Sequence, residues 1–199
     1  MNLKYLRIRR GFAAVLCGSM ATTLVLLIAQ GRWREAIPLH LCSICALLSL
    51  DLALRPRAWT LDILFYLGMP GAALALLFPA PSASACQMVM NASYVLTHAM
   101  ILVIPAALMI MGMRPRPGQA ARMMAYLLAS AFAADAVNRM LGTDFFFLSL
   151  PPAGTPLAAV YAWGMPAYII VLMMLMLLLC MGMDTLALHL SRLTAEKRE

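Results

Sequence analysis

The sequence predicts one all-α polytopic membrane protein with about six transmembrane helices and both termini in the cytoplasm. Three observations support this prediction: a very apolar composition, long apolar runs broken by proline, glycine and arginine, and basic residues concentrated on alternate loops. The 199 residues are 64% hydrophobic and 12% charged, and the mean hydropathy is +0.87. Soluble domains are about half apolar and about a quarter charged, so a water-soluble fold could not bury this much apolar surface.

The predicted helices follow the apolar runs, because a helix needs about 20 apolar residues to cross the hydrocarbon core. They lie near residues 11–30, 36–54, 60–79, 90–113, 119–141 and 157–183. They form a single membrane domain over residues 1–199, with turns at proline-rich segments such as Pro79–Ser82 and Pro151–Gly154. The first run is too long for a cleaved signal peptide and has no A-x-A site, so we expect it to remain as an anchor.

The loops differ strongly in basic charge when they are assigned to alternate sides of the bundle. One side holds twelve basic residues: Lys4, Arg7, Arg9, Arg10, Arg55, Arg57, Arg114, Arg116, Arg122, Arg192, Lys197 and Arg198. The other side holds three: Arg32, Arg34 and Arg139. The positive-inside rule therefore places both termini in the cytoplasm. An even number of crossings is required for that, which favours six helices over five or seven.

The net charge of +7 does not indicate a nucleic-acid partner, because the basic residues are scattered between apolar runs without aromatic platforms. Cys42 and Cys45 have the spacing of a redox or zinc pair, but no second pair follows and the flanking residues are apolar. We therefore expect no metal site and no cofactor. The 18 methionines are interpreted as packing and lipid-facing residues rather than as a metal or haem pathway.

Ionisable and amide side chains gather in the outer half of the predicted bundle. His40 belongs to the second predicted helix, His98 to the fourth, and Asp135 and Asn138 to the fifth. Such groups are costly in lipid and mark functional sites by default. We expect His40, His98 and Asn138 to converge on one outer-leaflet cavity. The alternative is that these residues form interhelical hydrogen bonds that only hold the bundle together.

Helical spacing predicts which of these residues share a face. Ser43 follows His40 by three residues and shares its face, whereas Cys42 lies about 200° around a regular helix from His40. On the fourth helix, Asn91, Tyr94 and His98 form one stripe.

The fifth predicted helix ends in a polar and aromatic segment. Asp135 is placed to pair with Arg139, one helical turn later. Next comes Gly142–Leu148, in which Asp144 precedes three phenylalanines. We predict an interfacial or re-entrant stretch that covers the outer cavity. A lipid-facing plug without a chemical role is the alternative.

Three of these stretches resemble a known family. They are Ile37–Ser43, Thr97–His98 and Asn138–Asp144, and they run through the chain in the family's order. In these stretches the chain resembles the YwaF-type bacterial integral membrane proteins, relatives of the eukaryotic transmembrane protein 164 acyltransferase. The resemblance implies a helical membrane fold, location in the bacterial inner (plasma) membrane as a multi-pass protein, and transfer of fatty acyl groups between phospholipids.

The eukaryotic branch is thought to use a cysteine and a histidine from different helices. His98 matches the histidine, whereas the cysteine position corresponds to Leu39 in this chain. The family nucleophile therefore does not carry over, and whether Cys42 replaces it stays open.

Two functions follow from these observations. The first is a phospholipid acyltransferase or lipid-acyl hydrolase, with His40 or His98 as general base and Cys42 or Ser43 as nucleophile. Asn91, Tyr94, Asp135, Asn138, Arg139 and Asp144 would then bind the substrate. The second is a non-catalytic lipid-binding, transport or assembly subunit of a membrane complex, whose partner would be another membrane protein.

Overall fold

The computed structural model describes residues 3–79, 86–152 and 154–196, and within these ranges every regular element is a helix. Five helical runs are long and apolar enough to cross a membrane, and one shorter apolar helix accompanies them. In chain order, these elements are α1 (Leu3–Ala29), α2 (Leu41–Leu54), α3 (Ala58–Ile63) with η1 (Leu64–Gly68) and α4 (Met69–Leu77), α5 (Gln87–Ile110), α6 (Ala120–Leu141) and α8 (Met165–Glu196). The predicted all-α polytopic membrane fold is confirmed.

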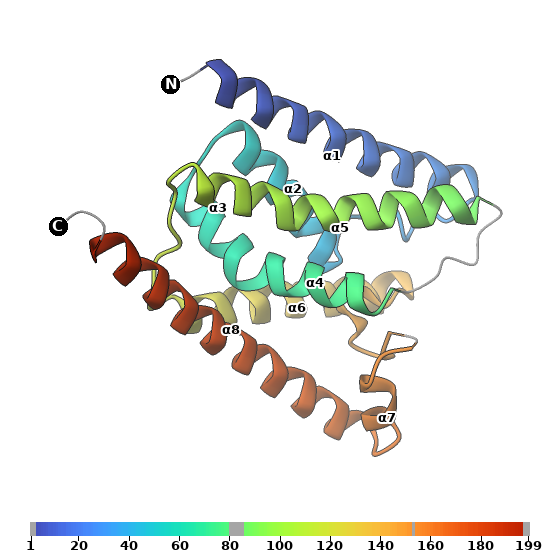
Figure 1. Ribbon diagram of the computed structural model, residues 1–199. Coiled ribbons are helices and arrows are strands. Elements are labelled where there is room, and N and C mark those ends of the chain that lie inside the picture. The colour runs from blue at the N-terminus through green and yellow to red at the C-terminus, as the bar shows by residue number, and fades with distance from the viewer. Residues whose placement is uncertain (1–2, 80–85, 153, 197–199) are drawn as a thin grey trace.

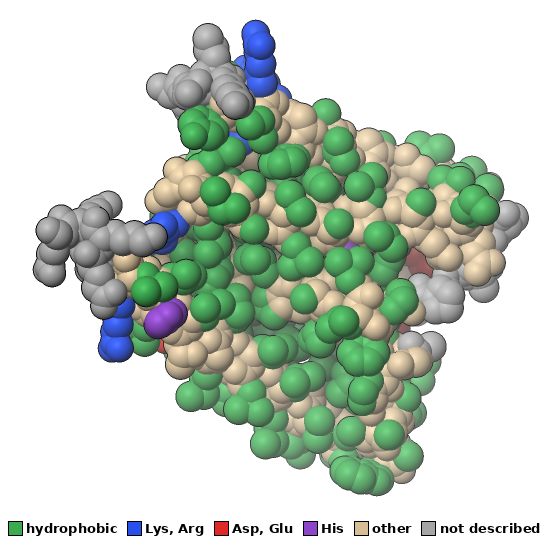
Figure 2. Space-filling view, in the orientation of Figure 1, with side chains coloured by type: hydrophobic (Ala, Val, Ile, Leu, Met, Phe, Trp, Pro, Cys, Tyr) green, Lys and Arg blue, Asp and Glu red, His purple; other side chains and the backbone are tan. Residues whose placement is uncertain are grey.

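The helices form a bundle in which both chain ends lie at the same end (Figure 1). α1 packs against α5 and α2, while α8 packs against α6 and the short helix α7 (Leu157–Tyr161). The lysine and arginine side chains visible in Figure 2 also gather toward the end where the termini lie. Of the sequence features discussed above, Ala80–Ser82, Ala153, Lys197 and Arg198 lie outside the described residues.

Two helices start later than the apolar pattern predicts. The second was expected near residue 36 but begins at Leu41, because Pro38 disfavours helical backbone at the residue before it. The last was expected from residue 157, but α7 ends at Tyr161 and α8 begins at Met165. Gly164 between them has a φ of 99°, a backbone conformation that favours glycine and interrupts the helix.

α2 is short for a membrane-crossing helix. Its 14 residues span about 21 Å, less than the hydrocarbon core thickness of about 30 Å. Its carboxyl end is closed by Arg9 of α1, a buried side chain that donates hydrogen bonds to Ala53 O at 2.8 Å and Leu54 O at 2.9 Å. A basic side chain here satisfies carbonyls that the helix leaves unpaired and complements the negative end of its dipole.

The third membrane crossing contains a π-helical turn, η1, between α3 and α4. Pro70 follows this turn and cannot donate a hydrogen bond to the carbonyl of Tyr66, which gives one physical reason for the irregular helix. Gly68 lies at a close approach: an added Cβ atom would come within 3.0 Å of Leu64 and 3.4 Å of Ile101. Gly68 and Ala72 are buried in this crossing, whereas nothing lies within 4 Å of a Cβ atom added at Gly71.

Candidate functional site

A cavity of about 550 Å³ lies at the end of the bundle opposite the termini. Two connecting segments build its wall, one preceding α2 and the other following α6. The lining residues are Arg34, Glu35, His40, Gly142, Thr143, Asp144, Phe145, Phe147, Leu150, Pro151 and Pro152. Because α2 is short, irregular backbone fills the space beyond its amino end, and such backbone is tolerated in a membrane protein where it lines a cavity.

His40 is the N-cap residue of α2, with φ −64° and ψ 146°. It therefore precedes the helix, and the angle of about 200° that a regular helix would put between His40 and Cys42 does not apply. Its imidazole contacts two rings of the segment that follows α6. The centroid of the His40 ring lies 5.1 Å from that of Phe145 and 5.3 Å from that of Phe147. Burial lowers the pKa of His40 below its usual value, and the carboxylates of Asp144 and Glu35 oppose this shift in part.

The two phenylalanines belong to the turn Thr143–Phe147, here called the phenylalanine turn. Its 3-10 segment, η2 (Phe145–Phe147), has left-handed backbone at Phe146 (φ 64°) and Phe147 (φ 53°). Residues with a Cβ atom rarely adopt this conformation, and it persists only where the surroundings hold it in place. The predicted covering stretch is thus a wall of the cavity that packs on His40.

Asn138 fixes one end of the phenylalanine turn from the last turn of α6. Its buried side chain donates to Phe145 O at 3.0 Å and accepts from Phe145 N at 2.8 Å and from Thr143 Oγ1 at 3.0 Å. Asp144 fixes the following backbone, accepting from Ser149 N at 2.9 Å and Leu150 N at 3.0 Å. Asn138 therefore supports the cavity wall without itself being a lining residue.

The other end of the turn is held by Tyr168 of α8, which the sequence analysis missed. Its hydroxyl donates to Phe147 O at 2.6 Å, and the residue is fully buried. A tyrosine within an apolar run has no periodic signal that distinguishes it from a lipid-facing residue. The buried hydroxyl is what requires a partner.

Cys42 and Ser43 lie in the first turn of α2, directly after His40. Both residues are partly buried. Neither is among the residues that line the cavity. The two predicted nucleophiles thus neighbour His40 in the chain but do not form the wall beside it.

His98 lies in the interior of the bundle and is buried. Its Nδ1 donates to Tyr94 O at 2.8 Å, and its ring lies 4.1 Å from the ring of Tyr94. The Tyr94 hydroxyl donates in turn to Ala75 O of α4 at 3.0 Å. Tyr94 and His98 are thus neighbours, as the predicted stripe requires, with Asn91 partly exposed on the same helix. None of the three is among the lining residues of the cavity beside His40.

Asp135 and Arg139 form the predicted i,i+4 ion pair, with 2.8 Å between Asp135 Oδ2 and Arg139 Nε. Their side chains are 40% and 78% exposed, respectively. The pair therefore lies on the surface of α6, and neither residue lines the cavity. A second pair, Arg32 with Glu35, lies at the cavity rim with 2.6 Å between Arg32 Nη2 and Glu35 Oε2.

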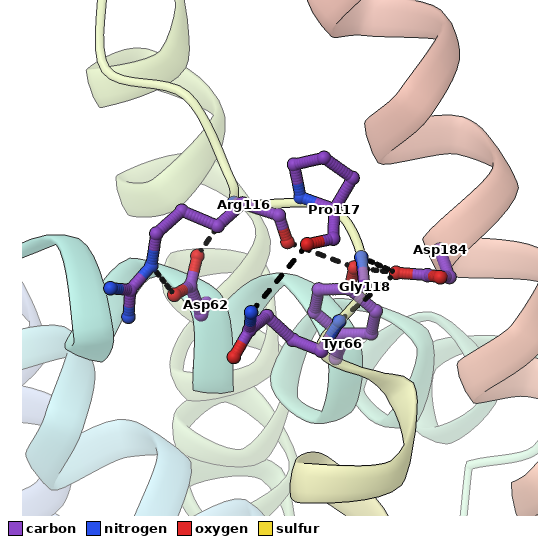
Figure 3. Close-up of polar contacts among 7 residues, drawn as sticks. Asp62, Tyr66, Arg116, Pro117, Gly118 and Asp184 are labelled. Carbon is purple, nitrogen blue, oxygen red and sulfur yellow. Dashed lines mark hydrogen bonds and ion pairs between the residues drawn. The ribbon is translucent and has the colours of Figure 1, made fainter.

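A second polar cluster, absent from the sequence analysis, lies at the end of the bundle that holds the termini (Figure 3). Asp62 of α3 is fully buried; it accepts from Arg116 N at 2.9 Å and Arg116 Nε at 2.6 Å. Asp184 of α8 accepts from Gly118 N at 2.7 Å, Gln119 N at 3.2 Å and the Tyr66 hydroxyl. These contacts fasten the α5–α6 loop to two other helices.

Comparison with protein-family models gives a match that covers nearly the whole chain. Residues 2–184 match the model of the TMEM164 family. Searches of the curated proteins and of the solved structures found no match.

Proposed function

Because the chain belongs to the TMEM164 family, we propose that it transfers or hydrolyses acyl esters of phospholipids in the outer leaflet of the bacterial inner membrane. The observation that carries the proposal is His40, an imidazole packed between two phenylalanine rings in the wall of a cavity that also presents Arg34, Glu35 and Asp144; burial lowers the pKa of His40, which favours the neutral form that a base requires. In this proposal His40 is the general base and the cavity receives the ester region of a phospholipid.

The proposed reaction needs no nucleophile from the protein. His40 takes the proton of an acceptor hydroxyl, either from a lysophospholipid or from water, as that oxygen attacks the ester carbonyl carbon. The tetrahedral intermediate then breaks its bond to the original alcohol oxygen, which takes the proton back from the imidazolium. α2 begins at the residue after His40, and in this proposal the positive end of its dipole would act on the developing oxyanion from behind the cavity wall.

The remaining cavity residues fit a phospholipid. Arg34 supplies a cation for a phosphate group, and Phe147, Leu150 and Pro151 give apolar surface for the beginning of an acyl chain. The proposal agrees with the acyl chemistry that the family resemblance implies. It departs from that resemblance in placing the base at His40, because His98 donates its Nδ1 proton to a backbone carbonyl and does not line the cavity.

A second function, non-catalytic lipid binding within a larger membrane complex, is favoured by one specific observation. The hydroxyl and carboxylate groups of the cavity wall already have partners: Thr143 donates to Asn138, and Asp144 accepts from two backbone amides. Cys42 and Ser43 do not line the cavity. In this case the cavity would hold a lipid without reacting with it.

The test is an acyl-transfer assay with the purified chain in lipid nanodiscs. The nanodiscs would contain a phospholipid with an isotopically labelled acyl chain and an unlabelled lysophospholipid, and mass spectrometry would follow label in the acceptor and in free fatty acid. The wild-type chain should form at least one of these products. His40→Gln should reduce the rate by about 100-fold or more, the usual contribution of a general base.

His189→Gln is the matched control, because His189 is an exposed histidine on α8; it should keep the wild-type rate. Absence of both products from the wild-type chain, or equal rates for wild type and His40→Gln, would contradict the acyl-transfer proposal. Lipid that still co-purifies with such an inactive chain, and is lost from a cavity variant such as Arg34→Glu, would support the binding function.

A further inference from the structure

The imidazole of His40 is oriented by rings rather than by hydrogen bonds. Within the described part of the chain, its side chain makes ring contacts with Phe145 and Phe147 and has no hydrogen-bond partner. A general base is effective only if its nitrogen is held close to the proton it takes. In this cavity that task falls to the two phenylalanine rings.

The backbone that carries these rings does not adopt its shape by local preference. Phe146 and Phe147 are consecutive non-glycine residues with positive φ, at 64° and 53°. Two external contacts hold the turn on either side of Phe146: the Asn138 side chain bonds both the N–H and the carbonyl of Phe145, and the Tyr168 hydroxyl donates to the carbonyl of Phe147. Both contacting side chains are buried and come from different helices, α6 and α8.

We infer that Asn138 and Tyr168 are positioning residues for His40, acting through the backbone of the phenylalanine turn to fix the imidazole at the cavity wall. The inference rests on the proposed function for its catalytic meaning, but its geometric part does not depend on catalysis. Tyr168 makes this contact with a single hydroxyl at 2.6 Å from Phe147 O, so Tyr168→Phe removes the contact and leaves the ring in place.

The first measurement is an NMR titration of ¹³C-labelled histidine in nanodiscs, with the His40 resonance identified by its loss in His40→Gln. In Tyr168→Phe, the ring-current shift of His40 should decrease and its pKa should move toward the usual value. The charged groups that share the cavity, Arg34, Glu35 and Asp144, are unchanged in this variant. A shift therefore reports the phenylalanine rings and the burial that they provide.

Tyr161→Phe is the matched control. The Tyr161 ring lies 5.7 Å from that of Tyr168, and within the described residues its hydroxyl has no hydrogen-bond partner. This variant should leave the His40 resonance at its wild-type position. If Tyr168→Phe perturbs the fold, Phe147→Leu provides the second test: it removes a 39%-exposed ring and should change the His40 shift in the same direction.

The second measurement is kinetic and separates this inference from the proposed function. In an active wild-type chain, Tyr168→Phe should lower kcat by about tenfold or more with little change in KM, while Tyr161→Phe should not. An unchanged His40 resonance in both Tyr168→Phe and Phe147→Leu would overturn the positioning role even if the chain is an active enzyme. A shifted resonance in a chain without acyl-transfer activity would refute the proposed function alone.

Discussion

Each of the three histidines of the chain lies in a different surrounding. His98 is buried and bonded to a backbone carbonyl of its own helix, and His189 is exposed on α8. Among the three, His40 is the one that lines the cavity described above. Its titration is therefore the one that can change the chemistry of the site.

The first prediction concerns the pH dependence of His40. Burial lowers its pKa below the usual 6.5, so the neutral base should predominate at pH 7 and be lost as the pH falls through the lowered pKa. The same shift means that the unfolded chain binds this proton more readily than the folded chain. Stability from this group is therefore present above pH 6.5 and lost as the pH falls toward the lowered pKa.

NMR titration of His40 should accordingly give a midpoint below 6.5. The pH profile of kcat/KM should decline on its acid side with the same midpoint. A His40 midpoint at or above 6.5 would mean that the carboxylates of Asp144 and Glu35 dominate over burial.

The second prediction concerns Arg9. Arg9→Ala leaves the carbonyls of Ala53 and Leu54 without their charged donor, which should reduce the free energy of unfolding by about 1–3 kcal/mol. Arg10 is exposed, so Arg10→Ala removes the same charge from the neighbouring position and should cost much less. Thermal unfolding of both variants in one detergent is the measurement, and equal midpoints would contradict the capping role.

Sequence patterns predict the elements of this fold better than they predict its polar contacts. The six apolar runs are visible because membrane-crossing helices must be long and apolar. His40, by contrast, was predicted to lie inside a helix, because the residues around it are apolar and only Pro38 indicates otherwise. Asp62 is an ionisable residue within an apolar run, and the rule that selected His98 would also have selected it. Tyr66 and Tyr168 carry no such signal in the sequence, because only their tertiary contacts distinguish them from lipid-facing tyrosines.

The third prediction tests helix packing in the third membrane crossing. Gly68→Ala should destabilise the chain by about 1–3 kcal/mol, because the added methyl group would come within 3.0 Å of Leu64 and 3.4 Å of Ile101. Gly71→Ala is the matched control, since nothing lies within 4 Å of the added group. Unfolding in detergent should separate the two variants. Equal stability would mean that the neighbouring side chains of Gly68 move aside at little cost.

The fourth prediction concerns the loop between α5 and α6. Tyr66→Phe removes the hydroxyl that bonds Asp184 and the carbonyl of Arg116 (Figure 3), which should cost about 1–2 kcal/mol. Hydrogen exchange at the amides of Gly118 and Gln119, which donate to Asp184, should accelerate because Asp184 would lose the donor that helps to orient its carboxylate. Tyr126→Phe alters an exposed ring and should leave the exchange rates unchanged. The same protection in both variants would argue against the fastening role of Tyr66.

For the whole molecule, the distribution of basic residues and an even number of crossings both predict that the two termini lie on the cytoplasmic side. The termini lie at one end of the bundle, the visible basic side chains gather there, and the cavity beside His40 lies at the opposite end (Figures 1 and 2). The α5–α6 loop at the end with the termini also carries Arg116, paired with the buried Asp62. The cavity can meet outer-leaflet phospholipid only if the positive-inside rule holds for this chain.

The final prediction tests that orientation by labelling with a membrane-impermeant thiol reagent. All five cysteines lie in the described part of the chain, and none of them forms a disulfide. Cys86 is exposed at the amino end of α5. Cys17 is also exposed, but it lies within the membrane-crossing part of α1, where an impermeant reagent does not reach it. Intact spheroplasts should therefore label at Cys86, and Cys86→Ser should abolish the signal. In that background, Arg114→Cys places a thiol at an exposed position of the α5–α6 loop, which should react only after the membrane is permeabilised. Labelling of Arg114→Cys in intact spheroplasts, with Cys86 silent in the parent chain, would invert the topology and move the cavity, with His40, to the inner leaflet.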